Sequence, residues 1–188
     1  MEKTLRTQTN LSAYNNSWYR PGSFFRLFAW YIANRLFINT YLPWPMTVKA
    51  AVLKLFGAKI GTGAVIKPKV NIKYPWFLSI GNYCWIGENV WIDNLTMVIM
   101  ESNVCLSQGS MLLTGNHDYT KSTFNLIIKP ITVESGAWIG AKATVCPGVK
   151  VGSHAVLTVN SVASGDMEPY GIYQGNPAKY LKTRNLKH

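Results

Sequence analysis

The sequence is poor in cysteine. Its 188 residues include three cysteines, Cys84, Cys105 and Cys146, and they form neither a CxxC motif nor a Cys/His cluster. Such a sparse, odd set is not the framework of a disulfide-rich secreted domain, and it offers no structural zinc site. The composition therefore favours a reducing, cytoplasmic location, and no metal is expected.

Acidic residues are also scarce. Eight Asp and Glu stand against 19 Lys and Arg, which gives a formal net charge of +11. This balance favours anionic partners such as nucleic acid, an anionic membrane surface or a phosphorylated small molecule. Because no recognisable nucleic-acid-binding motif accompanies the charge, nucleic acid is not an expected partner.

Long uninterrupted apolar runs are missing as well. The most apolar segment, residues 23–38, is short and is broken by Arg26 and Arg35, whereas a spanning helix needs about 20 apolar residues. The residues before it lack the apolar core and the cleavage site of a signal peptide. Two interpretations of this segment stay open: a helix that packs on the protein, and an interfacial helix that contacts a membrane surface.

What the sequence does contain is a period of six. Aliphatic residues recur at every sixth position in two runs and a shorter lead-in, with a two-residue slip at 74–77. The runs are Ile80, Ile86, Ile92, Val98 and Val104, then Val133, Ile139, Val145, Val151 and Leu157, and the lead-in is Ile60, Ile66 and Ile72.

Neither an α-helix nor an alternating strand has a period of six. A triangular coil does, because each hexapeptide supplies one short strand and one corner. The aliphatic residue points inward, and the glycine that often follows it, as in Gly81 and Gly140, is expected to accommodate the tight corner. Stacked coils bury a continuous apolar column. The predicted fold is an all-β parallel β-helix.

The segments outside the repeat complete the predicted organisation. Residues 1–56 form an N-terminal extension with two helices, of which the second places Val48, Ala51, Val52 and Leu55 on one face. These helices are expected to cap the open end of the solenoid. The repeat covers 57–165, a loop at 111–130 interrupts it, and an irregular strand-and-helix tail at 166–188 follows.

Histidine is the next scarce residue, with three in the chain. His188 is terminal, and His154 falls at an outward, solvated position of a repeat. His117 lies in the projecting loop, where a rigid scaffold commonly presents catalytic groups. A carbonic anhydrase on this scaffold would need three histidines on one zinc ion, so that function is excluded.

A family resemblance covers nearly all residues from about Phe25 onward. It rests on the motifs IKYPWFLSIG, NYCWIGENVWIDNLTMV, NVCLSQG, TGNHDY, ITVESGAWIGAKATVCPGVKVG and QGNPAKYLK. The chain resembles the colanic-acid-biosynthesis O-acetyltransferase branch of the hexapeptide-repeat acyltransferases, and it is similar to galactoside and maltose acetyltransferases. The resemblance implies a left-handed β-helix, acetyl-CoA as co-substrate, and a homotrimer with active sites between subunits.

The same resemblance implies roles for particular residues. It makes His117 the general base that deprotonates the acceptor, because imidazole can accept a proton near neutral pH. It places Asn94, Asp93 and Trp138 at the acceptor and the acetyl-transfer cleft. For CoA it implies Ala141, Val159, Ser164, Gly165, Lys179 and Lys182, although Ser164-Gly165 departs from the Thr-Lys that relatives often carry there.

The expected function is acetyl transfer from acetyl-CoA to a hydroxyl of a sugar or saccharide precursor, in exopolysaccharide or surface-glycan biosynthesis. Two alternatives stay open: N-acetylation of an amino or nucleotide sugar, and a non-catalytic β-helix adaptor. The outward residues Trp85, Trp91 and Met97 favour contacts between subunits or with the N-terminal helices. The expected location is cytoplasmic, with peripheral contact at the inner membrane face as one interpretation of residues 24–37.

Overall fold

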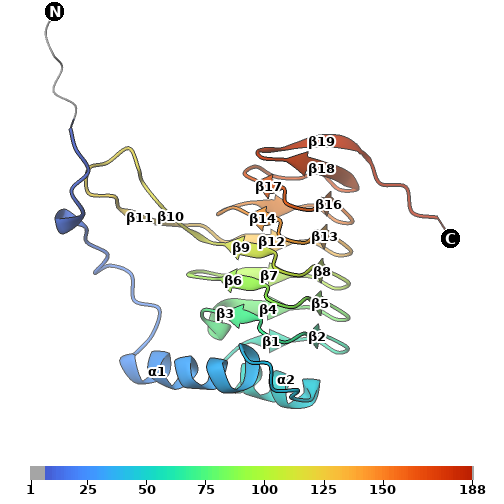
Figure 1. The fold of residues 1–188 in the computed structure, drawn as a ribbon, viewed down its shortest axis with the longest axis horizontal. Coiled ribbons are helices and arrows are strands. Elements are labelled where there is room, and N and C mark those ends of the chain that lie inside the picture. The colour runs from blue at the N-terminus through green and yellow to red at the C-terminus, as the bar shows by residue number, and fades with distance from the viewer. Residues whose placement is uncertain (1–6, 188) are drawn as a thin grey trace, which may run out of the picture.

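The computed structural model describes residues 7–187, so His188 lies outside the described residues. Its body is a parallel β-solenoid with three faces, here named sheets A, B and C (Figure 1). Sheet A contains β1 (Lys59–Ile60), β4 (Leu78–Ile80), β7 (Val98–Met100), β12 (Ile131–Val133) and β15 (Lys150–Val151). Sheet B contains β2 (Val65–Ile66), β5 (Trp85–Ile86), β8 (Cys105–Leu106), β13 (Trp138–Ile139), β16 (Val156–Leu157), β18 (Gly171–Gly175) and β19 (Ala178–Thr183). Sheet C contains β3 (Asn71–Ile72), β6 (Trp91–Asp93), β9 (Met111–Leu113), β14 (Thr144–Val145) and β17 (Val162–Ala163).

The core is the predicted apolar column. Every aliphatic residue of the two runs is buried, so the β-helix prediction is confirmed. The assignment of the first run, however, was wrong at its end. Ile80 pairs with Met100 and Ile86 with Leu106, while Val98 pairs with Leu78. Val98 and Val104 therefore occupy a second inward position, two residues before the main one.

This shift means that the early coils are longer than 18 residues. Successive equivalent positions are 20 residues apart from Ile60 to Ile80 and from Ile80 to Met100, and 18 apart from Val133 to Val151. The extra residues lie at the corner where sheet C returns to sheet A, in the segments 73–77 and 94–97. The first of these segments holds the 3₁₀ helix Pro75–Phe77. These wider corners shape the wall of the candidate site.

The glycines after the inward residues have a different role from the one predicted. Gly81 and Gly140 do not have positive φ; instead, a Cβ on Gly81 would lie 2.6 Å from the backbone of Glu101, and one on Gly140 2.7 Å from the carbonyl oxygen of Leu157. They permit close stacking of one coil on the next. The left-handed conformations of the corners fall two residues later, at Tyr83 (φ 56°) for example.

The helices lie along the base of the solenoid and cover the first coil, as predicted (Figure 1). α1 (Phe24–Ala33) continues into a π-helix (Asn34–Ile38), and α2 (Met46–Leu55) follows. The predicted face of α2 was wrong: Ala51 and Leu55 are exposed, whereas Leu53 and Lys49 are buried. The Lys49 side chain is only 3% exposed, and its Nζ donates to the carbonyl oxygen of Ile66 at 2.8 Å.

The loop begins later than predicted, because residues 111–113 form β9 in sheet C. Residues 114–130 project as a hairpin of β10 (Gly115–His117) and β11 (Leu126–Ile128). The N-terminal segment, residues 7–21 with a 3₁₀ turn at Leu11–Ala13, runs beside this hairpin before it reaches α1 (Figure 1). The N–H of Asn10 donates to the carbonyl oxygen of Ser122 at 2.8 Å. This part of the chain therefore does not cap the solenoid.

The tail is a two-stranded hairpin, and no helix forms within its described residues. β18 pairs in parallel with β16, and β19 pairs antiparallel with β18. His154 is also less solvated than predicted, because the ring of Tyr170 stacks on it at a centroid distance of 4.8 Å and an interplanar angle of 4°. The guanidinium of Arg184 donates to the carbonyl oxygen of His154 at 3.0 Å and covers the same corner.

Candidate active site

His117 lies at the end of β10, beside two aromatic rings. Phe124 stacks on the imidazole at a centroid distance of 4.3 Å and an interplanar angle of 7°, and the Tyr14 ring lies 5.6 Å away, tilted by 59°. His117 Nδ1 lies 2.9 Å from the carbonyl oxygen of Phe124. A carbonyl oxygen only accepts hydrogen bonds, so Nδ1 carries a proton and, in the neutral ring, Nε2 carries the lone pair.

His117 lines a cleft of about 600 Å³, a volume typical of small-molecule sites. We call it the His117 cleft, and its walls come from the N-terminal segment, the wide corners and the hairpin. The principal lining residues are Tyr14, Tyr19, Lys73, Tyr74, Asp93, Asn116 and His117. A Cβ at Gly115 would meet the end of the Leu95 side chain, so a larger residue there would require that side chain to move.

The wall opposite the hairpin carries an ion pair. Lys73 Nζ lies 2.9 Å from Asp93 Oδ1, and the two residues occupy equivalent places on successive coils, 20 residues apart. Asp93 is the one carboxylate that lines the cleft among residues 7–187. Since Lys73 neutralises it, the cleft offers no free anion to a cationic acceptor.

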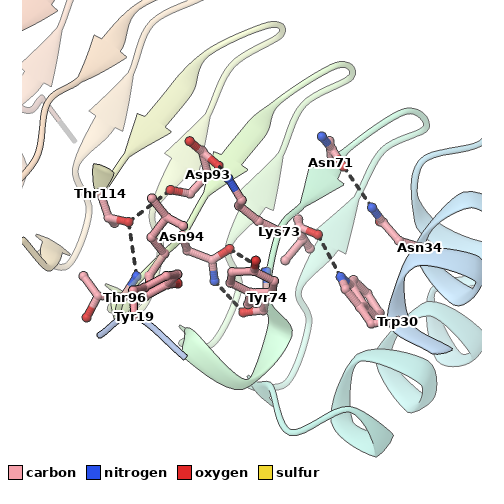
Figure 2. A network of polar contacts seen from close by, with 12 residues as sticks. Tyr19, Trp30, Asn34, Asn71, Lys73, Tyr74, Asp93, Asn94, Thr96 and Thr114 are labelled. Carbon is pink, nitrogen blue, oxygen red and sulfur yellow. Dashed lines mark hydrogen bonds and ion pairs between the residues drawn. The ribbon is translucent and has the colours of Figure 1, made fainter. Parts of the chain in front are cut away.

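Asn94 does not reach the cleft with its side chain. It is fully buried, and it exchanges two hydrogen bonds with the backbone of Tyr74: its Oδ1 accepts the N–H at 3.0 Å, and its Nδ2 donates to the carbonyl oxygen (Figure 2). Asn94 Nδ2 also donates to the carbonyl oxygen of Phe77. These bonds satisfy most of the capacity of one amide. Asn94 therefore fixes the 74–77 corner, and Tyr74, which the sequence did not single out, stands at the cleft in its place.

Tyr19 anchors the N-terminal segment to the same corner region. Its hydroxyl donates to the carbonyl oxygen of Leu95 at 2.6 Å (Figure 2). Burial, with smaller effects of Tyr74 and Asp93, raises the pKa of the Tyr19 phenol above its ordinary value. Burial likewise raises the pKa of Tyr74, against the opposing effect of Lys73. Both hydroxyls therefore stay protonated as hydrogen-bond donors across the neutral range.

The sequence did not reveal Tyr14, Tyr19 or Phe124, because they lie outside the repeat and nothing in their spacing connects them to His117. Lys73 and Tyr74 could have been found. Once the coil length is known to be 20, Lys73 must stack on Asp93.

Asp118 shapes the loop: its Oδ1 accepts from the backbone N–H and the hydroxyl of Thr120.

The cysteines are not nucleophiles of this site. All three are free, and burial raises the pKa of the Cys84, Cys105 and Cys146 thiols. Thiolates are the reactive form, so these thiols are poorly reactive at neutral pH. Within residues 7–187, no group of three or more His, Cys, Asp or Glu side chains is arranged to hold a metal ion.

No family model matches the chain. The chain is 35% identical over 136 residues to the putative colanic acid biosynthesis acetyltransferase WcaF of Escherichia coli (strain K12), covering 72% of this chain and 75% of that protein. The chain belongs to this acetyltransferase family. It is also 24% identical over 140 residues to the galactoside O-acetyltransferase of Escherichia coli (strain K12), covering 73% of this chain and 69% of the relative.

Solved structures of hexapeptide-repeat enzymes share the fold of this acetyltransferase. A hexapeptide-repeat acetyltransferase from Vibrio cholerae O1 biovar eltor, solved with acetyl coenzyme A, is 25% identical with a TM-score of 0.72 and covers 80% of this chain and 82% of its own. A galactoside acetyltransferase in complex with coenzyme A, 22% identical, superposes with a TM-score of 0.77 over 85% of this chain and 81% of its own.

The remaining predicted residues of the acetyltransferase lie away from the His117 cleft. Trp138 is on β13 in sheet B, where its Nε1 donates to Ser107 Oγ at 2.8 Å. Ala141 and Val159 stack at the corner between sheets B and C, and the N–H of Asn160 donates to the Ala141 carbonyl oxygen at 3.0 Å. The hairpin projects from the corner between sheets C and A instead (Figure 1).

The four remaining residues predicted to bind CoA lie in two separate places. Lys179 and Lys182 are exposed on β19 beside the top of sheet B, opposite Gln174 and Ile172. Ser164 and Gly165 are exposed just after β17, at the end of sheet C. One chain thus brings His117 together with Asp93 in one cleft, and it places Ala141 and Val159 at another corner of the solenoid.

Proposed function

We propose that this acetyltransferase uses acetyl-CoA to acetylate a hydroxyl of a sugar or saccharide precursor, in the biosynthesis of an exopolysaccharide or surface glycan. The observation that carries the proposal is the bond between His117 Nδ1 and the Phe124 carbonyl oxygen, because it leaves Nε2 as a base in a polar cleft. The relatives supply the donor by analogy: neighbouring structures contain acetyl coenzyme A or coenzyme A.

In the proposed reaction His117 Nε2 removes the proton of the acceptor hydroxyl as its oxygen bonds to the thioester carbonyl carbon. The carbonyl becomes an oxyanion, which backbone N–H groups of the coils would stabilise. When the carbon–sulfur bond breaks, the imidazolium returns the proton to the leaving thiolate. Transfer is direct, and the poorly reactive thiols of this chain support a path without an acyl-enzyme.

A hydroxyl acceptor fits the cleft better than an amine. An amino sugar would arrive as an ammonium ion, and the carboxylate of the cleft that could attract this ion, Asp93, already pairs with Lys73 at 2.9 Å. The test is acetyl-CoA-dependent thiol release with a panel of mono- and oligosaccharides, followed by treatment of the product with mild alkali. An O-acetyl ester loses its acetyl group under these conditions, whereas an N-acetyl amide keeps it and would contradict the proposal.

The placement of the CoA candidates supports a homotrimer. The pantetheine would lie along the corner that holds Ala141 and Val159, with Trp138 beside it, and Lys179 and Lys182 would pair with phosphates. The departure at Ser164-Gly165 removes no contact from this group, since those residues lie at a different corner. A complete site would then combine this corner of one subunit with the His117 cleft of its neighbour.

This arrangement predicts complementation between inactive variants. His117→Ala and Ala141→Trp, co-expressed with different tags and purified as mixed oligomers, should regain part of the activity that each lacks alone. A stable, active monomer in sedimentation, or mixed oligomers without activity, would contradict a shared site.

We also propose peripheral contact of the helical base with the inner membrane face. None of the helices among the described residues combines the length and the apolarity needed to cross a membrane. Residues 3–87 of the sequence contain eleven Lys and Arg and no acidic residue, although Lys49 is buried against Ile66 and Lys73 pairs with Asp93. On the same base Phe24, Phe25, Phe28, Ile32 and Leu55 are exposed.

Cations near an anionic bilayer contribute about 1 kcal/mol each, and apolar side chains add to this. Arg26 is engaged elsewhere, 4.1 Å above the Trp76 ring. The protein should float with 1:1 phosphatidylglycerol–phosphatidylcholine vesicles at low salt and not with phosphatidylcholine alone. The double substitution Phe25→Ser and Leu55→Ser should abolish flotation. If the unaltered chain did not float, membrane contact would be contradicted, and the helices would serve to cover the solenoid alone.

A further inference from the structure

A second hollow adjoins the His117 cleft. Its volume is about 420 Å³, and it lies between the N-terminal helices and the first two strands of sheet C. We call it the helix pocket, lined chiefly by Tyr31, Asn34, Arg35, Asn71 and Trp91. The two hollows share Lys73, Tyr74 and Asp93, so they are parts of one continuous surface.

Asn34 is a buried polar group in this pocket with an unused acceptor. The residue is 7% exposed, and its Nδ2 donates to Asn71 Oδ1 at 2.9 Å (Figure 2). Its Oδ1 has no hydrogen-bond partner among the described residues. A buried amide oxygen without a hydrogen bond is costly, so a water molecule or a polar group of a ligand is expected to bind it.

The backbone at this place is unusual as well. Asn34 is the first residue of the π-helix that follows α1. Trp30, one turn earlier, holds the helix against the solenoid, since its Nε1 donates to the carbonyl oxygen of Ile72 at 3.0 Å (Figure 2). The pocket is therefore built on fixed elements.

The other walls suit a sugar ring. Trp91 is 40% exposed on β6, and Tyr31 is exposed on α1, with the Arg35 guanidinium 5.4 Å from its ring centroid. An aromatic face is electron-rich and attracts the C–H side of a pyranose, while amides bond its hydroxyls. A saccharide uses both aromatic faces and nearby amides, whereas a purely apolar ligand would leave the amides without hydrogen bonds.

We infer that the helix pocket binds a second sugar ring of the acceptor, so that the substrate is a disaccharide or longer saccharide rather than a monosaccharide. One ring would lie by His117, and the next would pass the Lys73–Asp93 pair and stack on Trp91. The inference rests on the proposed acetyl transfer to a saccharide hydroxyl. It adds to that proposal the number of sugar rings in the acceptor and the residues that would bind the second ring.

The test compares acceptors of increasing length: methyl β-galactoside with lactose, and glucose with maltose and maltotriose, each with acetyl-CoA and thiol release as the readout. For whichever series is acetylated, kcat/KM should rise at least about tenfold from one ring to two, as expected for one buried ring with its hydrogen bonds. Trp91→Ala should remove that gain through KM, and it should lower the one-ring rate far less. Trp91→Tyr, which keeps an aromatic face, should restore most of it.

The matched control is Tyr83→Ala, which truncates an exposed aromatic of a coil corner that lines neither hollow. It should leave both one-ring and two-ring rates unchanged. Equal kcat/KM for one and two rings, or an equal loss for both in Trp91→Ala, would overturn the second-ring site while leaving acetyl transfer intact. Absence of transfer to every saccharide at high concentration would overturn the proposed function and this inference with it.

Discussion

His117 Nδ1 lies 2.9 Å from the carbonyl oxygen of Phe124, seven residues away across the same hairpin, and the Phe124 ring stacks on the imidazole. A single residue thus sets both the tautomer and the plane of the proposed base. Orientation by a fixed partner is what a general base requires, because the proton it takes must lie along its lone pair.

His117→Ala should lower kcat by about 10²–10⁴-fold, the usual contribution of a general base, with little change in thermal stability. The side chain lies on a projecting hairpin, so the apolar column should stay intact. Tyr119→Ala, on the same loop and 81% exposed, is the control and should keep wild-type activity. Steady-state kinetics with acetyl-CoA check this, and a kcat within a few-fold of wild type would remove His117 from the mechanism.

Tyr14→Ala should lower kcat several-fold, to about a tenth, because the imidazole loses the ring that confines it on one side. Tyr14→Phe keeps that ring and should behave as wild type. Leu11→Ala, on an exposed residue of the same segment, serves as the control. If Tyr14→Ala changed only the KM for acetyl-CoA, the ring would act on binding of the donor and not on the base.

Asn94→Ala should destabilise the fold by about 2–4 kcal/mol, because it leaves the backbone groups of Tyr74 and Phe77 without partners in a buried corner. Urea unfolding measures this. Asn185→Ala, near the exposed C-terminal end, should change stability by less than about 0.5 kcal/mol. An equally small effect of Asn94→Ala would show that the corner does not depend on the amide.

Tyr19→Phe should cost about 1 kcal/mol of stability at neutral pH through loss of the bond to the Leu95 carbonyl oxygen. The pKa of Tyr19 is raised in the fold, so this contribution is fully present below the ordinary tyrosine pKa of about 10 and is lost as pH rises through the higher folded value. The stability difference between wild type and variant should therefore be constant from pH 6 to 9 and shrink only above about pH 10. A difference that shrank between pH 6 and 9 would contradict this assignment.

Lys49→Ala should lower stability by about 1.5–3 kcal/mol, since it removes a charged donor from the Ile66 carbonyl oxygen at the open end of sheet B. Lys54→Ala, on the exposed face of the same helix, should be nearly neutral. Thermal and urea unfolding of the two variants would show whether the loss of stability comes from the buried Lys49 hydrogen bond or from the loss of a positive charge in general. Equal effects would mean that the Lys49 bond contributes nothing of its own.

The six-residue period was sufficient to predict the solenoid, because each coil repeats the same local demand for one inward aliphatic residue. Val133, Ile139 and Val145 show this most simply: their spacing alone placed them in one column, and all three are buried. The loop that carries His117 was visible for the same reason, as a break in that period. The predicted start of this loop was wrong. Val98 and Val104 continue the period of six, but they occupy the second inward position, two residues before the main one.

What the tertiary structure alone decided are contacts between segments that share no period. The ring of Tyr14 meets His117 across more than 100 residues of chain, and Asn34 comes to lie against Asn71 because the helices fold back over the first coil. The buried position of Lys49 has the same origin: the carbonyl oxygens of the first coil have no further coil beneath them, and a long cationic side chain can reach one. A sequence determines its repeats locally, since each unit has identical neighbours. Segments outside the repeat make contacts that depend on which part of the solenoid they fold back onto, and only the folded structure specifies that.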